Sequence, residues 1–90
     1  MAGKILVHSI PILSLFDSDA SHCFISSRFT ALHSIPLVCM SDQWEISTGK
    51  GIVTTNKICK ACTVELCDRK LKADMFVLDT GGYDVILGMT

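Results

Sequence analysis

The sequence has no excess of either charge. Eight Lys and Arg residues stand against nine Asp and Glu, which gives a formal net charge of −1 at pH 7. Because surfaces that bind nucleic acid or anionic membranes concentrate positive charge, we expect neither partner. Charged residues make up only 19% of the chain and hydrophobic residues 49%, which excludes an intrinsically disordered chain.

Long hydrophobic runs are also missing. The apolar stretch at residues 5–16 is interrupted by polar residues and Pro11, and it is too short to span a bilayer. The residues before it do not resemble a secretory signal peptide. The five cysteines are an odd number, which favours free thiols in a reducing compartment. We therefore expect a cytoplasmic protein.

The chain also contains no repeat, linker or low-complexity segment. Its 90 residues fit one domain over residues 1–90. A domain of this size buries only about two-thirds of its unfolded surface, so it gains stability from a partner.

Short β-branched runs alternate with turn residues, a pattern typical of a small all-β barrel or sandwich. A short helix is expected at residues 27–32, with Ser26 or Ser27 as its N-cap. The expected strands are residues 4–8, 12–16, 23–26, 44–47, 51–55, 58–67, 71–78 and 83–87. Residues 48–50 and 68–70 are expected to be the tips of two hairpins.

Strand alternation in residues 58–67 predicts which side chains share a face. Ile58, Cys62, Val64 and Leu66 fall on one face, with Lys60 intruding among them. The same alternation places Cys59 on the opposite face from Cys62.

Asp17 is the first candidate for chemistry. It follows an apolar run and precedes small polar residues. An acid at the mouth of a buried strand can act in proton transfer, although an Asp at this place more often begins a turn. The residues alone favour the turn.

Three segments together resemble a known family. FDSDASHCFIS at residues 16–26 is similar to the active-site segment of the retropepsin-like aspartic proteases of gypsy-type long-terminal-repeat retrotransposons. DMFVLD at residues 74–79 and YDVILGM at residues 83–89 resemble later segments of that family, in the same order and with similar spacing. The resemblance covers most of the chain.

The resemblance implies a small closed acid-protease barrel with one short helix, which forms half of a two-fold dimer. In that family two carboxylates share one proton. The ionised carboxylate activates a water and the protonated one donates to the peptide carbonyl oxygen. Asp17 would be the catalytic residue, and a second copy of the chain would supply its partner. The implied substrate is a peptide or polyprotein, and no cofactor or metal is required.

The resemblance also assigns supporting roles. Ser18 would hydrogen-bond across the dimer axis, and Ala20 would lie against the substrate. Thr48, Gly49 and Lys50 would form the flap that closes over an extended peptide. Ile86, Leu87 and Gly88 would pack beneath the catalytic loop.

Two departures from the family pattern concern activity. Asp19 stands where the family has glycine, and a carboxylate about 6 Å from the dyad disfavours its ionised form by about 3 kcal/mol at an effective dielectric of ~20. The sequence also stops at Thr90, inside a motif that continues in the family, so the C-terminal end is expected to be truncated. Two functions therefore stay open: a working endopeptidase, or an inactive retrotransposon-derived remnant that serves in dimerisation or peptide binding.

Two other motifs are weaker. Cys59, Cys62 and Cys67 have the first spacings of a zinc knuckle, but Lys72 stands at the last ligand position and only three ligands remain. We expect free thiols and no metal there. His22 lies close to Asp17 in the sequence, but sequence proximity does not make a catalytic triad, and a structural role is expected.

Overall fold

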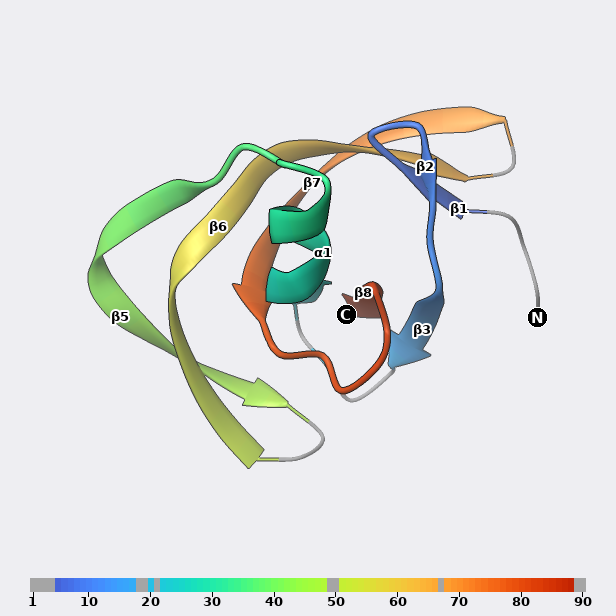
Figure 1. Ribbon diagram of the computed structural model, residues 1–90. Coiled ribbons are helices and arrows are strands. Elements are labelled where there is room, and N and C mark those ends of the chain that lie inside the picture. The colour runs from blue at the N-terminus through green and yellow to red at the C-terminus, as the bar shows by residue number, and fades with distance from the viewer. Residues whose placement is uncertain (1–4, 18–19, 21, 49–50, 67, 89–90) are drawn as a thin grey trace.

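The computed structural model describes residues 5–17, 20, 22–48, 51–66 and 68–88, and it is mostly β-structure (Figure 1). The eight strands form one sheet in the order β2-β1-β6-β7-β4-β8-β3, with β5 paired to β6 outside this path. The elements are β1 (Ile5–Val7), β2 (Ile10–Pro11), β3 (Ser14–Asp17), β4 (Cys23–Ser26), α1 (Ser27–Leu32), β5 (Val38–Thr48), β6 (Gly51–Leu66), β7 (Arg69–Leu78) and β8 (Val85–Gly88). The predicted all-β class with one short helix is confirmed.

Strands β5, β6 and β7 are longer than the sequence predicts. The two strands expected at residues 51–55 and 58–67 are one continuous strand, β6. The β6–β7 hairpin pairs Leu66 with Arg69, so Arg69 and Lys70 belong to β7 and not to the tip. The β5–β6 hairpin extends away from the rest of the sheet (lower left in Figure 1).

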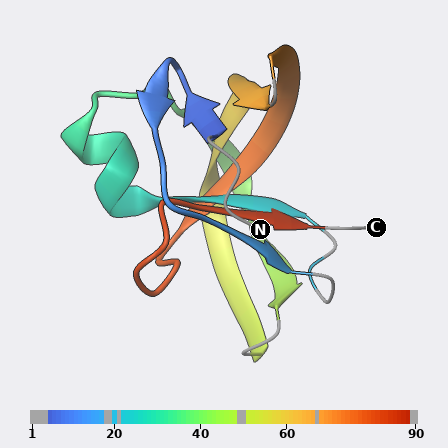
Figure 2. The ribbon, with the colours of Figure 1, turned by 90° about the vertical axis from the view of Figure 1, so that its right-hand side faces the viewer.

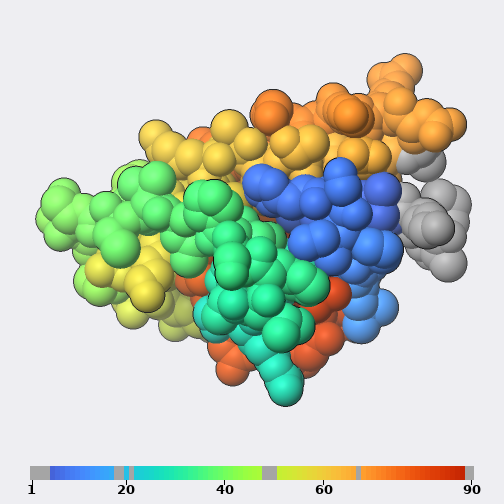
Figure 3. Space-filling model, turned by 45° about the horizontal axis from the view of Figure 1, so that its top comes forward, coloured from blue at the N-terminus to red at the C-terminus, as the bar shows by residue number. Residues whose placement is uncertain are grey.

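The N-terminal segment forms three short strands where the sequence predicts two. Pro11 lies within β2, at one end of the sheet order. A proline has no N–H to donate to a neighbouring strand, so an edge position tolerates it. His8 and Ser9 form the tight turn between β1 and β2, where Val7 pairs with Ile10. The space-filling view shows this blue segment against the yellow strand β6, with the orange strand β7 beyond it (Figure 3).

Strands β3, β8 and β4 form a unit in which the last strand of the chain lies between two early ones (Figure 2). β8 is parallel to β3 and antiparallel to β4. After β4 the chain enters α1, where the Ser26 hydroxyl accepts a hydrogen bond from the Phe29 amide at 3.2 Å. Ser26 is therefore the N-cap, one of the two residues expected.

The core consists of two clusters on opposite sides of the central strands. In β4, Phe24 belongs to one cluster and Ile25 to the other, and in β7 Met75 and Phe76 divide in the same way. These strands carry continuous apolar runs because both of their faces are buried. We call the cluster with Phe24 and Phe76 the loop-side cluster; its buried members are Ala20, Phe24, Ile46, Ile58 and Phe76.

Candidate functional site

Asp17 is the last residue of β3, at the end of the strand that leads into the loop. Its Cα pairs with that of Gly88 across the parallel β3–β8 ladder, and its side chain is half-buried. The Asp17 carbonyl accepts a hydrogen bond from the Ala20 amide at 3.2 Å, so the chain turns immediately after the strand. Asp17 is thus held by a strand that is paired to β8, and the hydrogen bond from the Ala20 amide ties the chain after it back to the same residue.

Gly88 lies beneath this loop with no room for a side chain. A Cβ on Gly88 would come within 2.4 Å of the His22 carbonyl oxygen and 2.7 Å of the Ala20 carbonyl oxygen. Both atoms belong to the backbone and cannot rotate away. Only glycine allows β8 to approach the loop this closely.

The loop is fixed from its inner side as well. Ala20 is 1% exposed and packs in the loop-side cluster. The His22 ring meets Phe76 edge-on, with ring centroids 5.3 Å apart. The Trp44 ring also packs against Phe76, at 5.7 Å, although half of Trp44 stays exposed. The ring contact of His22 gives it the kind of structural role expected from the sequence.

The opposite end of the β3–β8 pair is held by Asp84. Its carboxylate accepts a hydrogen bond from the Leu13 amide at 2.9 Å, and its own amide donates to the Leu13 carbonyl at 2.8 Å. The Asp84 carbonyl accepts from the Ser26 amide at 2.8 Å. Asp84 therefore joins the starts of β3, β8 and α1 and sets the register that brings Asp17 beside Gly88. The sequence motif contains Asp84 but gives no sign of this role.

The remaining candidate residues fall partly within the described structure. Ile86 and Leu87 pair with Leu15 and Phe16 in the parallel ladder, which places them beside β3, the strand that leads into the loop. Thr48 pairs with Gly51 at the end of the β5–β6 hairpin. Ser18, Asp19, Gly49 and Lys50 lie outside the described residues, as do Ser21 and Cys67.

A cavity of about 710 Å³ lies at the helix end of the sheet. Its lining includes Phe29, Leu32, Tyr83 and Asp84 but not Asp17. The cavity is therefore on the side of the β3–β8 pair that faces away from the loop, and it is not the place where Asp17 could act.

The cysteines of β6 differ from the expectation. Cys59 and Cys62 lie on the same interior face, and both are buried. The reason is a register shift between them, where Ala61 takes a left-handed conformation with φ +50° and interrupts strand alternation. The same bulge leaves Lys60 exposed, so it does not intrude on the buried face, and Ile58 joins a different core cluster from Cys62.

The bulge has its own hydrogen bond and an electrostatic consequence. The Ala61 amide donates to the Asp74 carboxylate at 2.8 Å, which satisfies a donor that the β6–β7 ladder leaves unpaired. The pKa of the Cys62 thiol is raised to about 12, mainly by burial and also by the hydrogen bond and charge of nearby Cys59, while Lys72 lowers it in part. Sequence reasoning missed Asp74 because its partner is created by the bulge.

The profile of the retroviral aspartyl protease family matches residues 1–90. The chain belongs to the retroviral aspartyl protease family. No curated protein matches the sequence. The six-residue helix α1 is far too short to cross a membrane, and the described residues contain no other helix.

Proposed function

We propose that two copies of this chain form one aspartic endopeptidase, with Asp17 of each copy at the two-fold axis. The observation that carries the proposal is the fit of Gly88 beneath the Asp17 loop, because Gly88 pairs with Asp17 and lies against the backbone of Ala20 and His22, which holds the loop at the end of β3. A preorganised acid is what proton transfer requires. Family membership supplies the reaction class: hydrolysis of peptide bonds.

The dimer follows from the chemistry. Two carboxylates held close together share one proton, so one is a base toward the attacking water and the other an acid toward the carbonyl oxygen. One chain supplies one such residue. Phe16, directly before Asp17, is half-exposed, and β3 stands at an end of the sheet order. A second copy would cover this apolar edge.

The neighbouring residues receive roles on the same basis. The active-site loop consists of Ser18, Asp19 and Ala20, which support the catalytic residue. The flap over an extended peptide is formed by Thr48, Gly49 and Lys50, and the loop is supported from below by Ile86, Leu87 and Gly88. The substrate is an extended segment of a polyprotein, and the chain derives from a gypsy-type element that acts in the cytoplasm. The described cysteines, Cys23, Cys39, Cys59 and Cys62, are all free, which supports a reducing compartment.

The test is cleavage of a peptide library between pH 4 and 7, with and without a pepstatin-type inhibitor. We expect cleavage that the inhibitor blocks and that Asp17→Asn abolishes, because an amide cannot act as the base. Asp17→Asn is nearly isosteric, so an equal urea midpoint for both proteins controls for folding. Cleavage that is indifferent to Asp17→Asn removes the protease assignment.

A second function is favoured by Asp19, which replaces the family's glycine. Its carboxylate would over-protonate the dyad near neutral pH and crowd the substrate. The chain would then be an inactive remnant that retains dimerisation or peptide binding. Asp19→Gly decides between the two: we expect it to raise the cleavage rate, with the largest gain near neutral pH. A pH–rate profile equal to that of the natural sequence would show that Asp19 does not impair the site.

A further inference from the structure

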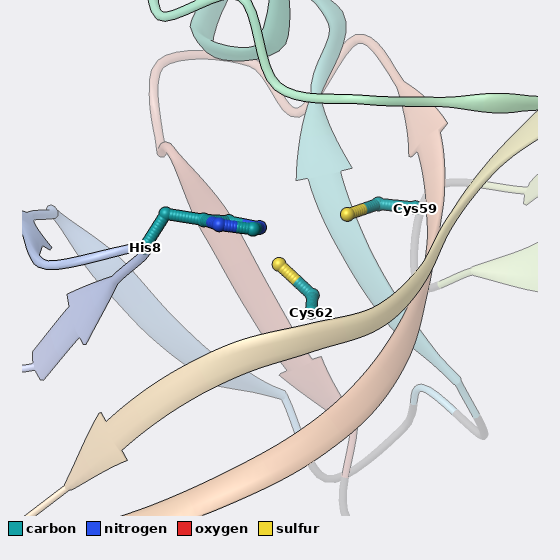
Figure 4. Close-up of side chains that lie close together, drawn as sticks. All are labelled: His8, Cys59 and Cys62. Atoms are coloured by element: carbon teal, nitrogen blue, oxygen red, sulfur yellow. The ribbon is translucent and has the colours of Figure 1, made fainter.

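His8, Cys59 and Cys62 form a cluster that the peptidase function does not use. Each side chain offers one atom that can bind a metal: an imidazole nitrogen from His8 and a sulfur from each cysteine. These three atoms all lie within 4.8 Å of one another. Figure 4 shows the imidazole and both sulfurs pointing toward one another. His8 comes from the β1–β2 turn and the cysteines from β6, so the fold brings together residues more than fifty positions apart.

Left-handed backbone conformations at two places, the β1–β2 turn and the β6 bulge, build this cluster. His8 has φ +50° and Ser9 φ +64° in the β1–β2 turn, and Ala61 has φ +50° in the bulge. Left-handed conformations cost residues other than glycine roughly 1 kcal/mol each. Without the left-handed β1–β2 turn, the imidazole would not project toward β6. Without the Ala61 bulge, the two thiols would lie on opposite faces of β6. Such strain often accompanies a functional site.

The turn is also fixed to β6 near the thiols. The His8 amide donates to the Thr63 carbonyl at 3.0 Å, one residue after Cys62. The imidazole is exposed, whereas Cys59 and Cys62 are 2% and 0% exposed. The cluster therefore has a buried sulfur side and a solvent side formed by His8.

The donor set selects the class of ion. Two sulfurs and an imidazole suit Zn²⁺, whereas Mg²⁺ and Ca²⁺ require oxygen ligands. Two thiolates and a neutral imidazole bring two negative charges, which balance the two positive charges of Zn²⁺. A neutral complex is the form that an apolar interior accepts at least cost.

The distances suit this ion after a small adjustment. Zn–S bonds of about 2.3 Å and Zn–N bonds of about 2.0 Å in tetrahedral geometry place ligand atoms about 3.5–3.8 Å apart. All three ligand atoms already lie within 4.8 Å of one another, so each separation must shorten by about 1 Å at most, and the exposed His8 ring is the member with most freedom to move.

We propose that His8, Cys59 and Cys62 bind one Zn²⁺ ion per chain, with the fourth position open to water on the His8 side. The ion joins the β1–β2 turn to β6 at the edge of the core and so stabilises a small domain with few other constraints. The site lies apart from the Asp17 loop and does not depend on the peptidase function.

The test measures binding of Zn²⁺ alone to the reduced, chelator-stripped chain, by competition with a chromophoric chelator. Co²⁺ serves as a spectroscopic substitute, because its visible absorption reports tetrahedral geometry and its near-ultraviolet absorption reports thiolate ligands. We expect one Zn²⁺ per chain, a thiolate-to-cobalt band, and a higher melting temperature with Zn²⁺ present.

Variants assign the ligands. His8→Asn keeps a residue that tolerates a positive φ and removes the imidazole, so we expect a normally folded chain with at least tenfold weaker Zn²⁺ binding. Cys62→Ala is expected to abolish the thiolate band. The matched controls, Cys39→Ser and His33→Asn, change exposed residues away from the cluster and should bind as the natural chain does. Absence of Zn²⁺ binding, or binding that His8→Asn and Cys62→Ala leave unchanged, overturns the proposal.

Discussion

The Asp17 loop and the Ala61 bulge are both places where a strand departs from regular geometry, but they are held in different ways. The loop is held by contact: Gly88 lies against the carbonyls of Ala20 and His22 with no space for a methyl group. The bulge carries an exposed hydrogen bond, from the Ala61 amide to the Asp74 carboxylate. A steric constraint of the first kind tolerates almost no change, whereas a polar one of the second kind can be replaced in part by water.

The two regions also differ in how far they can be separated from the rest of the fold. The loop depends on the β3–β8 register, which Asp84 sets at the far end of the same strands. The bulge lies in the β6–β7 ladder, and β6 is joined beside it to the β1–β2 turn by the hydrogen bond from the His8 amide to the Thr63 carbonyl. Changes in one region should therefore leave the function of the other intact, and the following predictions test that independence.

The largest effect is expected from Gly88→Ala. The added methyl group overlaps two backbone oxygens, so either β8 or the loop must move. We expect a loss of about 1–3 kcal/mol in the free energy of unfolding, as for other overpacked sites. A displacement of about 1 Å at a catalytic group lowers turnover by on the order of 100-fold. Urea denaturation and peptide cleavage, in the natural or the Asp19→Gly background, measure the two quantities.

Gly82→Ala is the matched control for that change. Gly82 has φ +115°, so an alanine there is strained, but its Cβ would meet no atom within 4 Å. We expect a stability loss of roughly 1 kcal/mol without a loss of turnover. Equal turnover losses in both variants would mean that backbone strain, and not contact with the loop, explains the effect of Gly88→Ala. Zn²⁺ binding should survive both changes.

The difference in constraint also explains what could be predicted from the sequence. The place of Asp17 at the end of a strand was predictable because the residues around it are contiguous and their pattern resembles a family motif. Helix α1 with its Ser26 cap follows from local preferences. The Cys59–Cys62 arrangement was not predictable, because strand alternation assumes an unbroken period of two. A positive φ at one residue, Ala61, brings the two cysteines onto the same face, and an alanine in the sequence does not predict a positive φ.

Long-range hydrogen bonds were beyond sequence reasoning for the same reason. Asp84 and Asp74 lie in segments that were noticed for their apolar neighbours, but their partners, Leu13 and Ala61, are 71 and 13 residues away. The extension of the hairpin strands was missed for a different reason. Asn56 and Lys57 interrupt the apolar pattern of β6, yet the strand continues through them. The buried Thr55 hydroxyl beside them donates to the Val77 carbonyl at 2.6 Å and so ties this part of β6 to β7.

An intermediate effect is expected from Asp74→Ala. The variant leaves the Ala61 amide without its carboxylate acceptor. Because this amide is exposed, water recovers part of the lost hydrogen-bond energy. We expect a loss of about 1 kcal/mol in the free energy of unfolding, and weaker Zn²⁺ binding because the bulge loosens. Asp74→Asn retains a carbonyl acceptor and should lose less than Asp74→Ala. Asp42→Ala, a change of the same charge at another exposed position, should lose almost nothing; equal losses for Asp74→Ala and Asp42→Ala would contradict a role in the bulge.

The smallest effect concerns thiol reactivity, because it leaves the fold unchanged. With a pKa of about 12, roughly one Cys62 thiol in ten thousand is ionised at pH 8, and only the thiolate reacts with iodoacetamide. In the presence of a chelator, exposed Cys39 should therefore be alkylated long before Cys62. Since the ionised fraction grows with pH up to the pKa, the Cys62 rate should rise about tenfold from pH 8 to pH 9. Peptide mass spectrometry resolves the alkylated sites. The variant Asp74→Ala should speed labelling of Cys62 but not of Cys39. If Cys62 reacts as fast as Cys39 in the natural chain, the bulge does not hold this thiol in the core.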